Sequence, residues 1–500
     1  MPKAPGGGGA TILRQPHRPL RAPATNRNGG TVIDQYYDHI APTQRHMQNF
    51  AKSRRLSTAS TRLYAGASMA PYPEDLYREH DVKRGLRNTD GSGVVAGLTR
   101  IADVHGYRKE DGKFIPDEGK LTIRGYDIAE IIDHAQAEDR FGYEELAYLL
   151  LAGALPRADE LESIGARIGS LRLLEEEYIS EFPLATKSNS IMNVLQRAVL
   201  MLYAFDETPD DITAPHEVDV ALSLLARLPR IAAIAHITHE AESSGIRVQV
   251  PEPNASASMA EAILQVLRGG DDYTHEEAML LDVMLMLHAE HGGGNNSTFT
   301  CRVLSSSATD AYSAYAAAIG SLKGPRHGGA NAKVTQMHAD IREHVAHWDD
   351  DEEVAAYLAK ILTGDAFDHS GLIYGMGHAI YTISDPRAQI CKRYARSLAD
   401  KKGLGEEFAL IERIERIAPG VMRDVRGMTK PICANIDLYT GFIYSILGVP
   451  EILFTPLFAV ARMAGWAAHR MEELYGAHRI IRPAYNAVLD DVTYVPLAKR

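Results

Sequence analysis

The sequence predicts a mainly α-helical protein with one small β element towards its N-terminal end. After residue 124, apolar residues recur at helical spacing through most of the chain, which is the pattern of helices packed around a core. Only residues 94–102 and 120–124 combine β-branched enrichment with turn-rich flanks, as short strands do. No internal repeat is present and strands do not alternate with helices, which disfavours Rossmann and barrel folds.

Helices are expected throughout the last two thirds of the chain. Several of the expected segments are apolar on most faces, as in the interior of a large helical protein. The segments are residues 143–152, 190–205, 218–242, 258–268, 275–290, 310–322, 331–344, 352–362, 386–400, 406–417, 433–447 and 456–474.

Composition restricts the class of protein. The chain has 500 residues, of which 45% are hydrophobic and 24% charged, enough for two or more domains with a large core. No apolar run reads as a membrane span. The net charge of −12 argues against a general nucleic-acid binder. The three cysteines are far apart and lack metal or redox spacing, which favours a reducing, cytoplasmic location.

The first 33 residues differ from the rest. They carry five basic residues and no acidic one, and they are rich in glycine and proline. Such a composition predicts a disordered basic tail. Its glycines and prolines oppose the amphipathic helix of a transit peptide. The rest of the chain is acidic, so it could bind an anion only at a site where arginines are clustered locally.

Three histidines lie in glycine-rich breaks between expected helices. His291 precedes three glycines, His327 lies within residues 324–331, and His378 lies in the run Tyr374-Gly375-Met376-Gly377-His378-Ala379. Glycines admit unusual backbone angles and close approach by a ligand. The three loops therefore either join helices or present donors that converge on a polar ligand. A histidine at a helix start, as expected for His327, tends to stay neutral and can polarise a carbonyl.

One carboxylate and three arginines complete the pattern. Asp437 lies among apolar neighbours, so its pKa should be raised and it should be a stronger base; capping or an ion pair is the alternative. Arg387, Arg462 and Arg482 lie in or beside apolar runs, and arginine is the best bidentate partner of carboxylates. Each of these arginines, taken alone, is more often part of a structural salt bridge. Together with the histidines and a base, they suit a dicarboxylate substrate undergoing carbon-acid chemistry.

Motifs for other site types are missing. There is no Walker loop and no Gly-x-Gly-x-x-Gly after a strand. The run His288-Ala289-Glu290-His291 superficially suggests a metal site. It matches neither the His-Glu-x-x-His nor the His-x-x-Glu-His arrangement and has no evident third ligand, so no metal is expected.

The motifs resemble the citrate synthase family in order and spacing over residues 91–482. Leu121-Thr122-Ile123-Arg124-Gly125-Tyr126-Asp127 is also similar to the family's N-terminal portion. The motifs that carry the resemblance are His288-Ala289-Glu290-His291, Gly324-Pro325-Arg326-His327-Gly328-Gly329-Ala330-Asn331, Gly375-Met376-Gly377-His378-Ala379 with Asp385-Pro386-Arg387, Asn435-Ile436-Asp437, and Arg482-Pro483.

The resemblance implies an almost all-α homodimer of two-domain subunits. The large domain would comprise residues 34–329 and 448–500, and the small domain residues 330–447. The small domain would be mobile and would close over the substrates to exclude water.

The resemblance also implies an acyltransferase that condenses acetyl-CoA with oxaloacetate and hydrolyses the thioester to citrate and CoA. Asp437 looks like the base that removes the methyl proton. His327 looks like the donor to the enol(ate) oxygen, and His378 like the group that polarises and protonates the ketone. Such a reaction belongs to the tricarboxylic acid cycle.

Substrate binding follows from the same resemblance. His291, Arg387 and Arg462 resemble the family's oxaloacetate ligands, and Arg482 resembles the arginine that the other subunit contributes. No permanently bound cofactor, nucleic acid or membrane is implied. Thr382 stands where many members have a Lys or Arg near the CoA phosphates, so Lys392, Arg393 or Arg326 would have to compensate.

Two alternatives remain open at this point. A 2-methylcitrate synthase would use propionyl-CoA with the same residues, and one extra methylene is worth only ~1–3 kcal/mol of discrimination. A catalytically silent member would act as a binding or assembly protein instead, although His327, His378 and Asp437 are all present.

Overall fold

The computed structural model describes most of the chain after residue 71. The described residues are 72–88, 92–111, 113–179, 188, 190–244, 251–325, 327–428 and 430–499. The expected tail at residues 1–33 lies outside them. The chain forms two compact units, Met1–Val82 and Lys83–Arg500. The first contributes helix α3 (Glu74–Glu79), and the second holds all the features described below.

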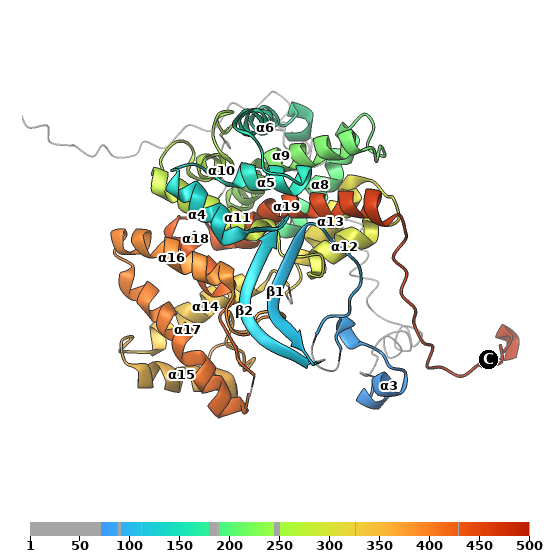
Figure 1. The fold of residues 1–500 in the computed structure, drawn as a ribbon, viewed down its shortest axis with the longest axis vertical. Coiled ribbons are helices and arrows are strands. Elements are labelled where there is room, and N and C mark those ends of the chain that lie inside the picture. Colours follow the sequence, from blue (N-terminus) through green and yellow to red (C-terminus); the bar gives the residue numbers. More distant parts are fainter. Residues whose placement is uncertain are drawn as a thin grey trace, which may run out of the picture. The chain divides into compact units, whose positions relative to one another are not determined.

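The second unit is mainly helical, as predicted (Figure 1). Each expected helix is present, with ends that differ by a few residues in most cases. The helices are α4 (Ile128–Ala137), α5 (Tyr143–Ala152), α6 (Ala158–Ser170), α8 (Ile191–Leu202), α9 (Ala214–Ser244), α10 (Met259–Arg268), α11 (His275–Ala289), α12 (Asn296–Ser305), α13 (Ala311–Leu322), α14 (Ala330–His344), α15 (Asp351–Thr363), α16 (Pro386–Lys401), α17 (Gly405–Arg426), α18 (Asp437–Ile446) and α19 (Phe454–Glu472).

Helices α4, α6 and α12 were not expected. Helix α4 buries Ile128, Ile131, Ile132 and Ala135, which is the i, i+3, i+4, i+7 pattern of a helix on a core. Helix α6 buries only Ile168 and Gly169, and most of the residues that α12 buries are polar, so the apolar periodicity of both helices is weak. A capping residue marks the start of α12, because the Asn295 side chain accepts from the backbone N–H of Thr298, the third residue of that helix.

Helix α18 begins four residues later than predicted. The prediction placed its start at Cys433, but Met376 and Ala434 form an isolated antiparallel bridge. The Gly377 N–H donates to the Cys433 carbonyl over 2.8 Å, and the Asn435 N–H donates to the Gly375 carbonyl over 2.9 Å. These pairings engage Cys433, Ala434 and Asn435 with the loop at Gly375–Gly377, so the helix starts only after them, and they join the His378 loop to the start of α18.

The β element is a three-stranded antiparallel sheet in the order β1 (Ala102–Glu110), β2 (Lys113–Ile123), β3 (Tyr126–Asp127). The strand expected at residues 120–124 lies within β2 up to Ile123. The strand expected at residues 94–102 was wrong except at Ala102, and Val95 and Leu98 are 87% and 90% exposed. A strand needs a hydrogen-bonded partner, and residues 102–110 form that pair with β2.

The β1–β2 ribbon lies against the loop that follows His378. The register of the two strands shifts at Gly106, where an added Cβ would come within 2.7 Å of the Ile380 carbonyl oxygen. The Gly119 N–H donates to Ser384 Oγ over 3.1 Å. Glycine at both positions therefore permits close backbone contact, and Figure 1 shows the ribbon beside α16.

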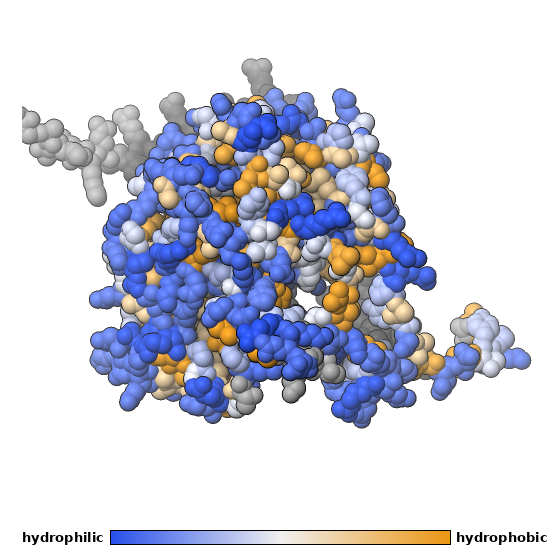
Figure 2. All heavy atoms as spheres, viewed as in Figure 1, coloured by the Kyte–Doolittle hydropathy of each residue, from blue (hydrophilic) through white to orange (hydrophobic). Residues whose placement is uncertain are grey.

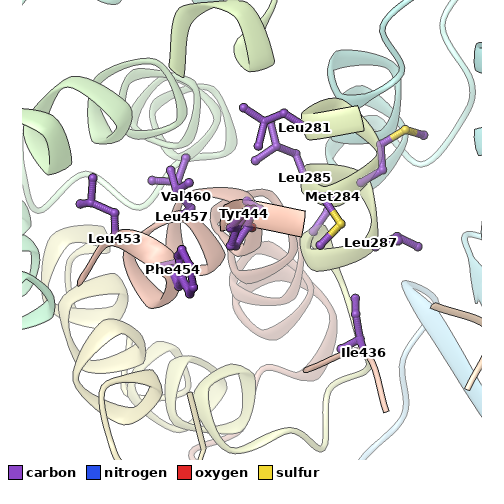
Figure 3. Packing of buried hydrophobic residues seen from close by; sticks show 14 of the residues in the cluster. Leu281, Met284, Leu285, Leu287, Ile436, Tyr444, Leu453, Phe454, Leu457 and Val460 are labelled. Carbon is purple, nitrogen blue, oxygen red and sulfur yellow. The ribbon is translucent and has the colours of Figure 1, made fainter. Parts of the chain in front are cut away.

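Helix α19 lies at the centre of the core. It packs against α5, α9, α11, α12 and α13, and Trp466 is fully buried. Figure 3 shows the apolar packing where α11, α18 and α19 meet. The labelled side chains are Leu281, Met284, Leu285 and Leu287 of α11, Ile436 just before α18, Tyr444 of α18, and Leu453, Phe454, Leu457 and Val460 at or in α19.

One described helix has the length and composition of a membrane span. The segment Ala214–His239 of α9 meets both criteria, which differs from the sequence prediction of no such run. Its most apolar window is 78% buried inside the protein. A helix that is buried to this extent is a core helix of the protein. Figure 2 shows hydrophilic residues over most of the visible face of the molecule.

Candidate active site

Six of the seven predicted site residues line one cavity of about 730 Å³. The cavity lies where several helix ends and the glycine-rich loops meet. The six residues are His291, His327, His378, Arg387, Asp437 and Arg462. Arg482 is not among the lining residues; it is exposed in the segment that follows α19.

Different elements supply the six residues. His291 follows α11, His327 precedes α14, and Asp437 opens α18. His378 lies in the loop before α16, Arg387 lies in the first turn of α16, and Arg462 lies within α19. The chemistry-bearing side chains are thus far apart in sequence, and the packing of these helices brings them together.

His327 is held by the start of α12. The Ser297 N–H donates to His327 Nε2 over 3.2 Å, and Ser297 Oγ lies 3.0 Å from the same nitrogen. A nitrogen that accepts an N–H cannot carry the proton, so neutral His327 has its hydrogen on Nδ1. Burial, aided by the Arg462 charge, lowers the His327 pKa to about 4. The predicted neutral state is supported, but burial dominates rather than the start of α14.

His378 has the opposite tautomer. Its Nδ1 accepts the backbone N–H groups of Ile380 and Tyr381, each over 3.1 Å. The proton of neutral His378 is therefore on Nε2. Burial and then the Arg387 charge lower the His378 pKa to about 4. Two neutral histidines thus present N–H donors at one cavity.

His291 contacts both His378 and a tyrosine. Its ring lies 5.1 Å from the His378 ring at 84°, and its Nε2 lies 3.3 Å from the hydroxyl of Tyr381. Burial and the Arg387 charge lower its pKa well below the usual value. His291 is therefore neutral at pH 7 and has one donor and one acceptor nitrogen.

Asp437 has the raised pKa that the sequence predicted. Desolvation raises the pKa to about 6, the charge of Arg387 opposes the rise, and Asp385 adds to it. Within the described residues its carboxylate oxygens accept no hydrogen bond, while its N–H donates to Asn435 Oδ1 over 3.0 Å. A partly desolvated carboxylate at a cavity wall is suited to proton abstraction.

Two arginines place positive charge at the cavity. Arg387 forms a bidentate pair with Asp385, with Nε–Oδ1 and Nη2–Oδ2 distances of 3.0 and 2.7 Å. Arg462 is 1% exposed, and its Nε donates to the His288 carbonyl over 2.6 Å. Burial lowers its pKa to about 10, so it is charged at pH 7. In the part of the chain that the structure describes, no other hydrogen bond from Arg462 is found, so its guanidinium can receive a carboxylate.

The His-x-Glu-His run does not act as a unit. His288 Nδ1 lies 2.8 Å from the Met284 carbonyl, so it donates to its own helix. Glu290 accepts from the Gly292 N–H and lies 2.9 Å from Nε2 of His469. Among the described residues, no three His, Cys, Asp or Glu side chains are grouped so as to hold a metal ion.

The sequence prediction missed several neighbours of the site. Arg87 lines the cavity and donates to the Ala379 carbonyl over 3.4 Å; no local pattern indicates this. Ser297 could have been found from the Asn295 cap two residues before it. Tyr381 is fully buried, and its ring contacts the rings of His291 and His378.

The residues considered for the CoA phosphates have other surroundings. Thr382 is half-buried and does not line the cavity, and its hydroxyl finds no hydrogen-bond partner in the part of the chain that the structure describes. Lys392 pairs with Glu415 and Arg393 with Asp133. Arg326 lies outside the described residues.

Comparison with known proteins agrees with this geometry. The family model "Citrate synthase, C-terminal domain" matches residues 88–484. The citrate synthase of Deinococcus radiodurans is 33% identical over 366 residues, which cover 73% of this chain and 89% of that protein. The 2-methylcitrate synthase 1 of Corynebacterium glutamicum is 31% identical over 428 residues, covering 84% and 99%.

A solved structure has the same fold. It is the citrate synthase of Thermoplasma acidophilum in a ternary complex with carboxymethyl coenzyme A and oxaloacetate, with a TM-score of 0.67 and 26% identity, covering 84% of this chain and 99% of that one. The fold, the matched region and the relatives together show that this chain belongs to the citrate synthase family, whose members are enzymes of the citrate synthase type.

Proposed function

We propose that this protein condenses acetyl-CoA with oxaloacetate and hydrolyses the product to citrate and CoA. The observation that carries the proposal is the convergence of one carboxylate of raised pKa and two neutral histidine donors on one cavity. A related protein has been crystallised with oxaloacetate and a CoA analogue, which supports this substrate pair.

Oxaloacetate would enter between the buried arginines. Its two carboxylates need positive charge and directional donors, which Arg387 and Arg462 offer at the cavity wall. His291 adds a neutral donor. Binding in this way holds the ketone beside His378, so the reaction gains from proximity and orientation.

Asp437 would begin the chemistry by taking a proton from the methyl group of acetyl-CoA. The methyl proton of a thioester is a weak acid, so the negative charge that develops on the thioester oxygen must be stabilised. The Nδ1–H of His327 is a neutral donor for that oxygen. The proton affinity of a neutral imidazole matches that of an enol more closely than the proton affinity of an imidazolium cation does. The result is an enol(ate) at the cavity.

Carbon–carbon bond formation would follow. The nucleophilic carbon attacks the ketone carbon of oxaloacetate, and the ketone oxygen takes the proton from His378 Nε2. The proton that Asp437 removed is released to solvent and His378 takes one up, so both groups return to their starting states. The product is citryl-CoA. Water then adds to its thioester carbonyl, the carbon–sulfur bond breaks, and citrate and CoA are released. Closure of a small domain at residues 330–447 would keep water out until condensation is complete.

A second copy of the chain would complete the site. Arg482 is exposed after α19, and the segment around it runs away from the helices (Figure 1). Apolar side chains in this segment are open to solvent, including Tyr485 at 94%, Leu489 at 88% and Val492 at 89%. Apolar surface of this kind favours burial against a partner. We propose a cytoplasmic homodimer in which each Arg482 reaches the other subunit's cavity.

A thiol-release assay tests the proposal. Purified protein is given oxaloacetate with acetyl-CoA or with propionyl-CoA, and free CoA is measured; Asp437→Asn and the omission of oxaloacetate serve as controls. We expect the higher kcat/KM with acetyl-CoA. A clear preference for propionyl-CoA would make the protein a 2-methylcitrate synthase, a candidate that the similar identity of the Corynebacterium relative supports. Release with neither thioester would indicate a catalytically silent member.

A further inference from the structure

Tyr381 lies behind the cavity and contacts three of the residues that line it. Its side chain is fully buried, and it is not itself among the lining residues. The position is three residues after His378 and four before the ion pair formed by Asp385 and Arg387. The proposed mechanism gives this tyrosine no role.

The ring of Tyr381 supports His378. The two ring centroids are 4.7 Å apart at an interplanar angle of 25°, which is a stacked arrangement. The Tyr381 N–H also donates to His378 Nδ1 over 3.1 Å. Stacking restrains the plane of the imidazole, while the backbone donor sets its tautomer. The guanidinium carbon of Arg387 lies 5.7 Å from the same tyrosine ring, within cation–π distance.

The hydroxyl of Tyr381 contacts His291. Its oxygen lies 3.3 Å from His291 Nε2, and no other hydrogen bond of this hydroxyl is found within the described residues. Burial raises the pKa of the tyrosine, so the hydroxyl keeps its proton and can donate it. A donor at Nε2 places the proton of neutral His291 on Nδ1, which leaves an N–H for an anion.

We propose that Tyr381 is a positioning residue: its hydroxyl sets the tautomer of His291 for oxaloacetate binding, and its ring holds His378 in place. The inference rests on the proposed function and assigns one of its residues a further role. The inference gives the hydroxyl and the ring of Tyr381 different roles. The hydroxyl acts on substrate affinity and the ring acts on turnover.

Two variants separate these effects. Tyr381→Phe keeps the ring and removes the hydroxyl, so oxaloacetate affinity should fall about 3- to 10-fold, as expected for one hydrogen bond, while kcat changes little. Tyr381→Leu removes the ring as well, so kcat should fall further. Oxaloacetate binding is measured by calorimetry without acyl-CoA, kcat by thiol release, and folding by thermal denaturation.

Tyr315→Phe is the matched control. Tyr315 of α13 is also fully buried, and its hydroxyl has no hydrogen-bond partner in the described part of the chain. Removing that hydroxyl should leave oxaloacetate affinity and kcat unchanged. The control measures the effect of the same substitution away from the site.

A double-mutant cycle with His291→Ala decides whether the hydroxyl acts through His291. If it does, adding Tyr381→Phe to His291→Ala should change oxaloacetate affinity by less than about twofold. An undiminished loss in that background, or a Tyr381→Phe protein that binds like the wild type, would overturn the inference. A wild-type protein that binds no oxaloacetate would instead remove the proposed function, and this inference with it.

Discussion

The backbone N–H of Ser297 donates to Nε2 of His327 over 3.2 Å. Ser297 is the second residue of α12, and an N–H at this position has no partner within its own helix. The donated hydrogen decides which nitrogen of His327 carries the proton. A helix start far away in the sequence thus sets the donor that faces the thioester in the proposed mechanism.

Replacing Ser297 by proline should remove this control. Proline is tolerated in the first turn of a helix, so Ser297→Pro deletes the N–H with little loss of α12. Ser297→Ala is the control, because it also lacks the hydroxyl but keeps the N–H. We expect kcat of the proline variant to be about 10-fold below that of the alanine variant, measured by thiol release. Equal rates would show that the N–H does not matter.

Activity should depend on the ionisation of Asp437. The base must be deprotonated, and its pKa is raised to about 6, so kcat/KM should fall as the pH drops below about 6 and level off above it. His327 and His378 have pKa values of about 4 and stay neutral over this range. Asp437→Asn should lower kcat about 10²- to 10⁴-fold. Its oxaloacetate affinity, measured by calorimetry, should be retained; a lost affinity would contradict the assignment.

The same substitution should stabilise the fold. Because the folded-state pKa of Asp437 is above its usual 3.8, the ionised carboxylate opposes folding above pH 6. This penalty decreases as the pH falls from 6 towards 3.8, where the folded state takes up the proton. Asp437→Asn should therefore raise the free energy of unfolding by about 1–3 kcal/mol at pH 7.5. Urea titrations should show a smaller gain at pH 5, and a loss at pH 7.5 would contradict it.

Two mid-helix glycines should respond in opposite ways to alanine. A Cβ on Gly165 of α6 meets nothing within 4 Å, so Gly165→Ala should stabilise by about 0.5–1 kcal/mol through helix propensity. A Cβ on Gly465 of α19 would overlap the Ala289 carbonyl and the Glu290 carboxylate. Gly465→Ala should destabilise by about 1–3 kcal/mol, also measured in urea. Similar signs would show that α11 and α19 can move apart.

Subunit mixing tests the role of Arg482. Asp437→Asn and Arg482→Ala should each be inactive as pure proteins. In a mixed dimer, the cavity with intact Asp437 would receive the intact Arg482 of the other subunit, so activity should return after co-refolding. The control is each variant refolded alone. A mixture that stays inactive would place Arg482 in its own subunit's site or outside any site.

The sequence alone determined the chemical inventory and most helices. Apolar periodicity depends on nearby residues, so it located α5, whose bounds agree with the prediction, and the centre of most other helices. The chemical type of each side chain is also known from the sequence alone. Asp437 among apolar neighbours predicted a raised pKa. Of the three arginines beside apolar runs, Arg387 and Arg462 lie buried at the cavity, whereas Arg482 is exposed.

Only the tertiary structure decided how these groups are paired. The tautomers of His327 and His378 depend on backbone N–H groups, which every residue except proline has and which therefore leave no mark in a sequence. The first strand and the start of α18 depend on distant backbone partners in the same way. Tyr381 is an ordinary aromatic residue in the sequence. It becomes part of the site only because the chain stacks it on His378 and places its hydroxyl beside His291.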